Sequence, residues 1–206
     1  MSDKPLSILP GQRGVEDHVI REQLLVAAND HFGHYGYGKT TVSDLAGAIG
    51  FSKAYIYKFF ESKQAIGEAI CRQCTGTILR ATVAALDTNA TATQQFRTLF
   101  LTLVEQSSEL FFLHRKLYEI VTVSTVERWR SSREHEDLVH DLVREILLSG
   151  RKSGEFERKT PLDEVCRSIV QALQPFTNPM MLQYNLDALP LALHETLSLV
   201  LRSLSP

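Results

Sequence analysis

Cationic and phenolic side chains gather in one short part of this 206-residue chain. Between His31 and Lys63 the sequence has four lysines and only two acidic residues, although the formal net charge of the whole chain is −2. Lysine ammonium groups and tyrosine hydroxyls are groups that contact the phosphates of nucleic acids. Because salt screens distant charges, the field close to the contact decides whether a polyanion binds. The segment therefore predicts a local nucleic-acid interface on a chain with no overall attraction to polyanions.

Two short helices are needed to position these side chains. Thr41 and Asp44 have the spacing of a capping box, which predicts that a helix begins here. Gly50 suits the left-handed turn that ends this helix, and Ser52 is expected to cap a second helix that leaves at a steep angle. The apolar residues of the first helix recur at the helical period and are Val42, Leu45, Ala46 and Ile49.

The second helix has an apolar side and a cationic side. Ile56 and Phe60 are four residues apart and face the first helix, and Phe51 is expected to pack against Ile56 as a hydrophobic staple. The residues that remain outward near its N-terminus are Lys53, Tyr55, Tyr57 and Lys58. Two helices joined by a tight glycine turn are typical of a helix-turn-helix, whose second helix enters the major groove of DNA.

The stretch "ANDHFGHYGYGKTTVSDLAGAIGFSKAYIYKFFESKQAI" resembles the N-terminal domain of tetracycline-repressor-type (TetR family) regulators. Those sequences typically have a phenylalanine that closes the first helix, then "GY", "TTV", "IA" and a glycine, followed by "VSKGTLYxHFxSKE". The resemblance implies a cytoplasmic bacterial transcription regulator, most often a repressor. Such a regulator binds a pseudo-palindromic double-stranded DNA operator as a homodimer and is released by a small-molecule effector.

The resemblance also implies which residues contact DNA. Ala54 and Tyr55 replace the frequent glycine and threonine of the family, and Glu61 adds a negative charge. The operator sequence therefore cannot be read from relatives. Carried over by position, the DNA contacts are Thr40, Thr41, Ser43, Ser52, Lys53, Ala54, Tyr55, Tyr57, Lys58 and Lys63.

The remainder of the chain has the apolar period of helices and no rival pattern of alternating strands. We therefore predict an all-α fold of about nine helices, with an N-terminal three-helix helix-turn-helix domain and a C-terminal helical bundle. The expected parts are a flexible N-terminal arm over residues 1–14, a DNA-binding domain over residues 15–61, and an effector-binding and dimerisation domain over residues 62–206.

Glycine, proline and capping residues set several expected helix ends. Gly33 is expected to stop the first helix, and Gly154 to stop a long amphipathic helix. Thr160 is expected to cap the next helix, with Pro161 in its first turn. Asp187 is expected to cap the last helix.

Three further expectations concern the middle of the chain. A long helix from Ser62 to about Leu86 leads out of the DNA-binding segment. The stretch "ELFFLHRKLYEIVTVST" is expected to form one helix, separate from the helix over "QQFRTLFLTLVEQ". Pro175 and Pro179 are expected to bracket an irregular stretch.

The resemblance assigns effector binding and dimerisation to the second domain. Its middle helices are rich in aromatic surface, with a few polar groups that suit the orientation of a ligand. The candidate pocket residues are Phe96, Phe100, Phe111, Phe112, His114, Tyr118, Glu119 and Trp129. Two later helices have apolar faces suited to a four-helix dimer interface. The candidate interface residues are Val165, Ile169, Leu173, Leu193, Leu197, Val200, Leu201 and Leu204.

Other classes of function have less support in the sequence. There is no nucleophile–base set, P-loop, GxGxxG or HExxH, so we expect no enzyme activity, no cofactor and no bound metal. No apolar stretch is long enough for a membrane span, no signal peptide is evident, and an odd count of three cysteines fits a reducing cytoplasm.

Two alternatives to the effector-released repressor stay open. Cys71 and Cys74 share one face of a helix, so the first alternative is a redox-responsive regulator that acts through this pair. The second alternative is a helical ligand-binding or catalytic protein with a vestigial DNA domain.

Overall fold

The computed structural model describes residues 12–189 and 191–206, and it is all-helical over them, as the sequence predicts. These residues form eleven α-helices and one 3-10 helix, and no strand occurs among them. The arm expected over residues 1–14 lies outside the described residues as far as residue 11, and α1 begins at residue 12. The elements are α1 (Gln12–Tyr35), α2 (Val42–Ile49), α3 (Lys53–Tyr57), α4 (Lys63–Ala85), α5 (Ala92–Leu113), α6 (Arg115–Val126), α7 (Arg130–Ser153), α8 (Leu162–Ala172), α9 (Gln174–Thr177), α10 (Pro179–Asn185), η1 (Leu186–Ala188) and α11 (Leu191–Ser203).

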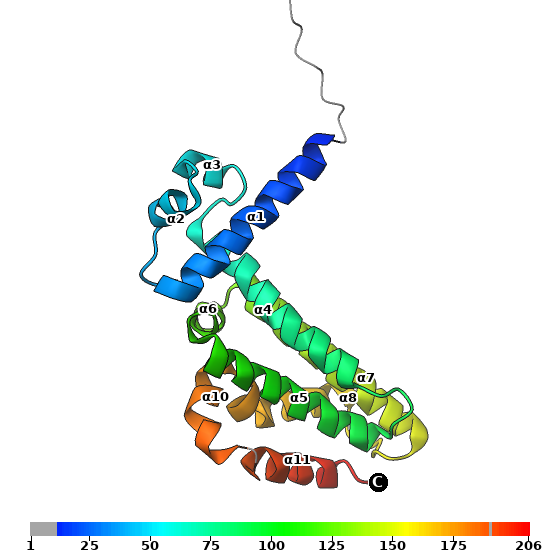
Figure 1. The fold of residues 1–206 in the computed structure, drawn as a ribbon. Coiled ribbons are helices and arrows are strands. Elements are labelled where there is room, and N and C mark those ends of the chain that lie inside the picture. Colours follow the sequence, from blue (N-terminus) through cyan, green and yellow to red (C-terminus); the bar gives the residue numbers. More distant parts are fainter. Residues whose placement is uncertain (1–11, 190) are drawn as a thin grey trace, which may run out of the picture.

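A small N-terminal group of helices is joined to a larger helical bundle (Figure 1). α1, α2 and α3 lie together at one end of the molecule, and α4 runs from this group along the bundle. In the bundle, α4 packs against α5, α6 and α7, and α7 packs against α8. α6 also contacts α1, so α4 and α6 both connect the two parts.

The first hydrophobic core lies between α1, α2 and α3 and is completed by side chains from the bundle. Ile66 and Ile70 of α4, Ile120 of α6 and Trp129 are all buried in it. Full burial of a side chain of this size is worth roughly 1.5–3 kcal/mol relative to exposure. The helix-turn-helix therefore depends on residues well beyond the expected domain boundary at residue 61.

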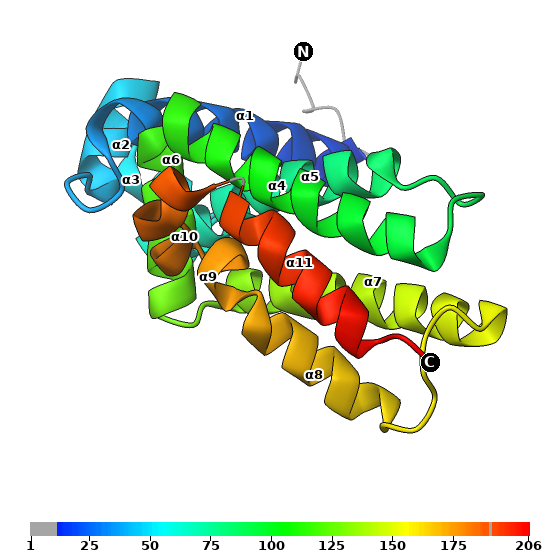
Figure 2. The ribbon, with the colours of Figure 1, turned by 90° about the horizontal axis from the view of Figure 1, so that it is seen from below.

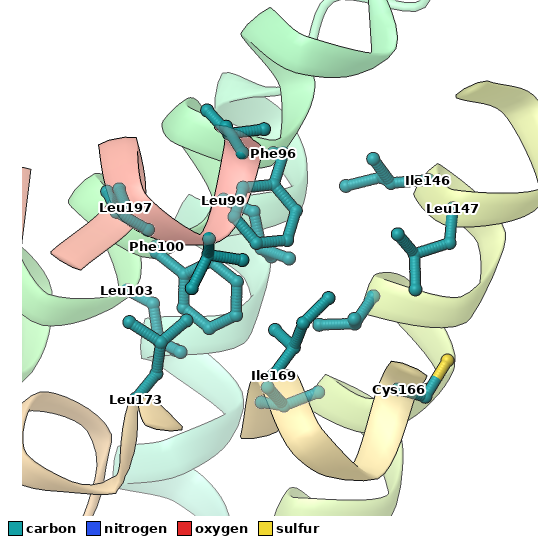
Figure 3. Packing of buried hydrophobic residues seen from close by; sticks show 14 of the residues in the cluster. Phe96, Leu99, Phe100, Leu103, Ile146, Leu147, Cys166, Ile169, Leu173 and Leu197 are labelled. Atoms are coloured by element: carbon teal, nitrogen blue, oxygen red, sulfur yellow. The ribbon is translucent and has the colours of Figure 1, made fainter. Parts of the chain in front are cut away.

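The second hydrophobic core fills the bundle. Figure 3 shows Phe96 and Phe100 of α5 turned toward the space between Ile146 of α7 and Ile169 of α8, with Leu197 of α11 beside them. Ile78 of α4 also belongs to this core, so one helix supplies apolar side chains to both cores.

Two helix ends differ from the sequence prediction because the local signals were misread. α1 does not stop at Gly33 but continues to Tyr35, and the left-handed residue is Gly36, with φ +84°. α5 runs to Leu113 without a break, because Ser107 and Ser108 donate their hydroxyls to carbonyls one turn earlier and stay helical. The break between α5 and α6 falls instead at His114, with φ −134°.

The proline-rich part of the chain is more regular than expected. Pro175 and Pro179 occupy the first turns of α9 and α10, where a missing backbone N–H costs nothing. Asn178 caps α10 by accepting a hydrogen bond from Met180 N at 2.9 Å. These two short helices explain why the structure has eleven α-helices where the sequence predicts about nine.

The starts of α8 and α11 also differ from the prediction, whereas Gly154 ends α7 as expected, with φ +85°. The residue before α8 is Pro161 rather than Thr160, and the Thr160 N–H is donated to the Glu157 carboxylate. Asp187 lies within η1 and not at the start of α11.

Candidate nucleic-acid interface and internal cavity

The helix-turn-helix is built from local caps that match the sequence prediction. Thr41 and Asp44 form the full capping box: Thr41 N donates to Asp44 Oδ2 at 2.7 Å, and Asp44 N donates to Thr41 Oγ1 at 3.2 Å. The hydrogen bonds from the Thr41 backbone and hydroxyl hold the pKa of the Asp44 carboxyl below its ordinary value. Gly50 has φ +78°, a left-handed conformation that other residues adopt only with strain. Ser52 Oγ accepts from Tyr55 N at 3.1 Å and caps α3.

α3 turns one side toward the first core and the other toward solvent. Ile56 is buried on the inner side, and Lys53, Tyr57 and Lys58 are exposed on the outer side. Lys53 Nζ lies 5.8 Å from the centre of the Tyr57 ring, within the range of a cation–π contact. The outer side of α3 thus presents cationic and phenolic groups together.

Tyr55 has a mixed environment. Its ring is half-buried between Phe51 and Phe59, with ring centroids 5.0 and 5.4 Å away. Phe51 is 38% exposed, and its ring is tilted by 31° relative to that of Tyr55; the hydrophobic staple between Phe51 and Ile56 stays a prediction. This aromatic row fixes the direction of the Tyr55 hydroxyl, because a ring held on both sides has few alternative rotamers.

The residues expected at the start of α2 are divided between core and surface. Thr40 is buried, and its hydroxyl donates to the Gly36 carbonyl at 2.8 Å, so Thr40 shapes the turn and does not face a ligand. Thr41 and Ser43 are exposed, as are Ser52 and Ala54 at the start of α3. The exposed residues among the predicted DNA contacts therefore lie at the starts of α2 and α3, together with Tyr57 and Lys58 at the end of α3.

Two of the lysines that are predicted to contact DNA already interact with other side chains of the protein. Lys58 Nζ lies 3.3 Å from Asp17 Oδ1, and both side chains are more than half exposed. Sequence reasoning missed Asp17, because nothing in the spacing of α1 and α3 indicates that they meet there. Lys63 Nζ lies 4.1 Å over the centre of the Tyr37 ring, and partial burial lowers the pKa of its ammonium group.

A cavity of about 70 Å³ lies in the bundle between α4, α5, α6, α7 and the segment from α8 to α10. Its wall is mainly apolar, with hydroxyl, amide, imidazole and carboxyl groups at intervals. The lining residues include Ile78, Leu103, Ser107, Leu110, Tyr118, Val121, Ser132, His135, Glu136, Val139, Gln174 and Leu182.

Of the eight residues predicted to line an effector pocket, Tyr118 alone is part of this wall. Phe96 and Phe100 are in the second core and Trp129 is in the first, because large aromatic rings fill a core efficiently. Glu119 lies at a separate surface hollow beside α6. The rest lie around the junction of α5 and α6 and are Phe111, Phe112 and His114.

Burial shifts the pKa values of the ionisable groups of the cavity. Burial lowers the pKa of His135 to about 4, so its imidazole is neutral at physiological pH. Burial raises the pKa of Tyr118 to about 12, and the Tyr118 hydroxyl donates to the Pro179 carbonyl at 2.7 Å. Burial also raises the pKa of Glu136, with Arg128 acting in the opposite direction.

The residues expected at a dimer interface all face the interior of their own chain. They belong to the second core and are Val165, Ile169, Leu173, Leu193, Leu197, Val200, Leu201 and Leu204. α8 and α11 lie toward the viewer in Figure 2. On α11, Leu191 and Leu199 are 67% and 61% exposed.

The cysteine pair lies on α4 at the first core, with Cys71 inside it and Cys74 packed against it. Cys71 is buried and Cys74 is partly buried, and both are free thiols. Burial raises the pKa of the Cys71 thiol, and it raises that of Cys74 to about 12. The described residues contain no group of three or more His, Cys, Asp and Glu side chains placed to hold a metal ion. None of the described helices is both long enough and apolar enough to cross a membrane.

Two family descriptions match the sequence. "Bacterial regulatory proteins, tetR family" matches residues 24–70, and "Tetracyclin repressor-like, C-terminal domain" matches residues 92–190. The HTH-type transcriptional repressor Rv1474c of Mycobacterium tuberculosis is 42% identical over 62 residues. That match covers 29% of this chain and 33% of the relative, so the chain spans about a third of the length of this curated relative.

Solved structures of similar fold cover nearly the whole chain. FadR from Bacillus subtilis, in complex with stearoyl-CoA, has a TM-score of 0.64 and 17% identity over 89% of this chain and 98% of its own. A transcriptional regulator from Cytophaga hutchinsonii has a TM-score of 0.64 and 18% identity over 90% and 98%. FadR from Bacillus halodurans has a TM-score of 0.63 and 17% identity over 88% and 94%. At this level of identity the likeness shows the fold alone.

Proposed function

We propose that this chain, which belongs to the tetracycline-repressor (TetR) family of bacterial regulators, is a ligand-responsive transcriptional repressor. It binds a pseudo-palindromic operator as a homodimer, and a small-molecule effector releases it from the DNA. We assign DNA binding to residues 15–61, and effector binding and dimerisation to residues 62–206.

The outer side of α3 carries the DNA-binding part of the proposal. Lys53, Tyr57 and Lys58 are exposed together, while Ile56 anchors the helix from the inner side. A recognition helix needs this division, because its outer residues must reach base edges and phosphates while its inner residues fix its position. The likeness to a repressor over 62 residues supports the same function.

Selection of bound genomic fragments, followed by fluorescence anisotropy on the selected operator, tests this part. Lys53→Ala and Tyr57→Ala should weaken binding and change the preferred sequence, because one good base contact is worth roughly 1–3 kcal/mol of discrimination. Lys152→Ala, at an exposed position near the end of α7, is the matched control. Enrichment of no fragment, or the same affinity and sequence preference in all variants, would reject the assignment.

The dimer part of the proposal needs a different surface from the one expected. The apolar faces of α8 and α11 are already used by the second core, so we assign the interface to their outward residues. Leu191 and Leu199 are apolar side chains on this outer surface. They are exposed to water in the monomer, and a second subunit would cover them. A two-fold dimer would present two copies of α3 to a pseudo-palindrome.

The internal cavity supports release by an effector rather than by oxidation. It lies where four long helices meet, a usual place for a ligand in a helical bundle. A fold relative, FadR of Bacillus subtilis, was solved with stearoyl-CoA bound, which supports small-molecule binding by this fold. Redox control through Cys71 and Cys74 is disfavoured, because burial raises both thiol pKa values and reactive cysteines need a thiolate.

A further inference from the structure

The size of the internal cavity restricts the molecule that it can hold. Its volume is about 70 Å³. On the same kind of measure, a cavity of roughly 10–15 Å³ is the smallest that holds one water molecule. A cavity of roughly 150 Å³ holds benzene. A molecule with a single ring would therefore have to extend toward the open side of this cavity, and a long acyl chain would require the helices to move apart.

The hydroxyl groups of the cavity wall already donate their protons in hydrogen bonds within the protein. Six hydroxyls line it, and each donates its proton to a main-chain carbonyl at 2.7 to 3.1 Å. Their residues are Thr75, Ser107, Tyr118, Thr125, Ser132 and Thr177. An anionic group would have to displace these bonds to obtain the donors that it needs.

The charges around the cavity also oppose an anion. The wall contains no lysine or arginine, and Glu136 is its one carboxyl group. Arg128 and Arg115 act electrostatically on Glu136 and Tyr118, but neither arginine lines the cavity. Burial of an unpaired carboxylate or phosphate in such a site costs several kcal/mol or more.

Polar side chains of the wall remain available to a ligand: the Glu136 carboxyl and the Asn178 amide N–H groups at its edge, and His135 and Gln174. The His135 imidazole and the Gln174 amide have no hydrogen-bond partner within the described part of the chain, and both are partly buried. A neutral imidazole has one donor and one acceptor, and an amide offers both kinds of group. We infer that the effector is a small, largely apolar molecule without an anionic group, whose polar group hydrogen-bonds to His135 and Gln174. This inference rests on the proposed function, because it takes the cavity to be the effector site.

Calorimetric titration of the full chain at pH 7.5 with three probes of one size tests the inference: benzyl alcohol, benzoate and benzylamine. Benzyl alcohol should bind about tenfold or more tightly than benzoate, because the carboxylate of benzoate would be buried without a cationic partner. Benzylamine, whose ammonium group can pair with the Glu136 carboxyl, should also bind more tightly than benzoate. Binding of benzoate with an affinity equal to or higher than that of the other two probes would overturn the inference. Failure of all three probes to bind would overturn it as well.

Variants locate the binding. His135→Leu should weaken the binding of benzyl alcohol about fivefold or more, while His140→Leu on the same helix, outside the cavity wall, should leave it unchanged. Gln174→Arg places a cation at the wall and should increase the affinity for benzoate. This gain does not depend on whether His135→Leu folds. Equal effects of the two histidine variants, or no gain with Gln174→Arg, would place the probe elsewhere.

Different measurements test the inference and the proposed function. Probe binding is measured without DNA and concerns the cavity alone. Operator binding, and its loss when benzyl alcohol is added, are measured by anisotropy. If benzyl alcohol binds through His135 and the operator complex persists, the chemistry of the cavity stands and release by an effector is rejected. If the operator is bound and benzyl alcohol does not bind, the DNA-binding function stands and the inference is rejected.

Discussion

Trp129 packs edge-to-face against Tyr37, with the ring centroids 5.4 Å apart. Tyr37 lies in the turn between α1 and α2, whereas Trp129 directly precedes α7 of the bundle. The Trp129 carbonyl accepts a hydrogen bond from Ser132 Oγ at 2.9 Å, and Ser132 lines the internal cavity. A wall of the cavity is therefore connected to the helix-turn-helix by one hydrogen bond and one aromatic contact. Together with α4, this contact is a route by which a ligand could bias the DNA-binding domain.

Gly67 of α4 is the residue that lets these two rings approach. A Cβ atom there would lie 2.8 Å from Tyr37 Cε2 and 2.9 Å from Trp129 Cζ3, so the rings would have to shift. We expect Gly67→Ala to lower the free energy of unfolding by about 1–3 kcal/mol in urea titrations. Gly76→Ala, where the new atom meets the flexible end of Arg80, is the control and should stabilise the helix by up to about 1 kcal/mol. Equal stability of Gly67→Ala and the parent would contradict the packing argument.

The ion pair between Asp17 and Lys58 should compete with DNA. Lys58 Nζ lies 3.3 Å from the Asp17 carboxylate on the exposed side of the helix-turn-helix. Asp17→Asn should strengthen operator binding at low salt and steepen the salt dependence by about one unit per subunit, because Lys58 becomes free to contact a phosphate. Anisotropy between 50 and 200 mM salt, roughly the range in which phosphate contacts are resolved, measures both effects. Asp30→Asn, also exposed on α1, should change the slope less; equal slopes in the two variants would argue against the competition.

The two cysteines of α4 should react slowly in the folded protein. Because burial raises the pKa of Cys74 to about 12, roughly one thiol in ten thousand is a thiolate at pH 8, and the raised pKa of Cys71 acts in the same direction. Mass spectrometry after iodoacetamide treatment should show slow modification in buffer and fast modification in urea. Rapid labelling of the native protein, accompanied by loss of operator binding, would restore the redox alternative.

Substitution on the outer side of α11 should separate dimerisation from folding. Leu199 is 61% exposed, so Leu199→Glu should produce a monomer in sedimentation velocity with little change in thermal stability. Leu197 is fully buried two residues earlier, and Leu197→Ala should cost about 2–5 kcal/mol of folding free energy. An unchanged dimer in Leu199→Glu would exclude this surface as the interface.

The helix-turn-helix was predictable because its signals are local. The capping box of Thr41 and Asp44, the turn at Gly50 and the cap at Ser52 each depend on residues at most four positions apart. Such signals do not depend on how the rest of the chain packs. The all-α class was predictable for a similar reason, since the apolar period can be read within each segment.

The sites in the bundle were not predictable to the same degree, because they depend on which helices meet. An apolar stripe such as that of Val165 and Ile169 indicates a buried face, but it does not indicate whether its own chain or a second copy covers it. The same limitation explains why aromatic content led to Phe96 and Phe100, which fill the core, while His135 and Gln174 of the cavity wall were missed.

Because α4 contributes to both cores, the DNA-binding segment cannot simply be exchanged with that of another regulator. Ile66 and Ile70 complete the packing under the helix-turn-helix, and Ile78 of the same helix packs in the bundle. A fragment cut at residue 61 would expose the apolar surface that Ile66, Ile70, Ile120 and Trp129 cover. A hybrid regulator that fuses this DNA-binding segment to another bundle should therefore fold cooperatively only if the residues at these four positions are transferred with it.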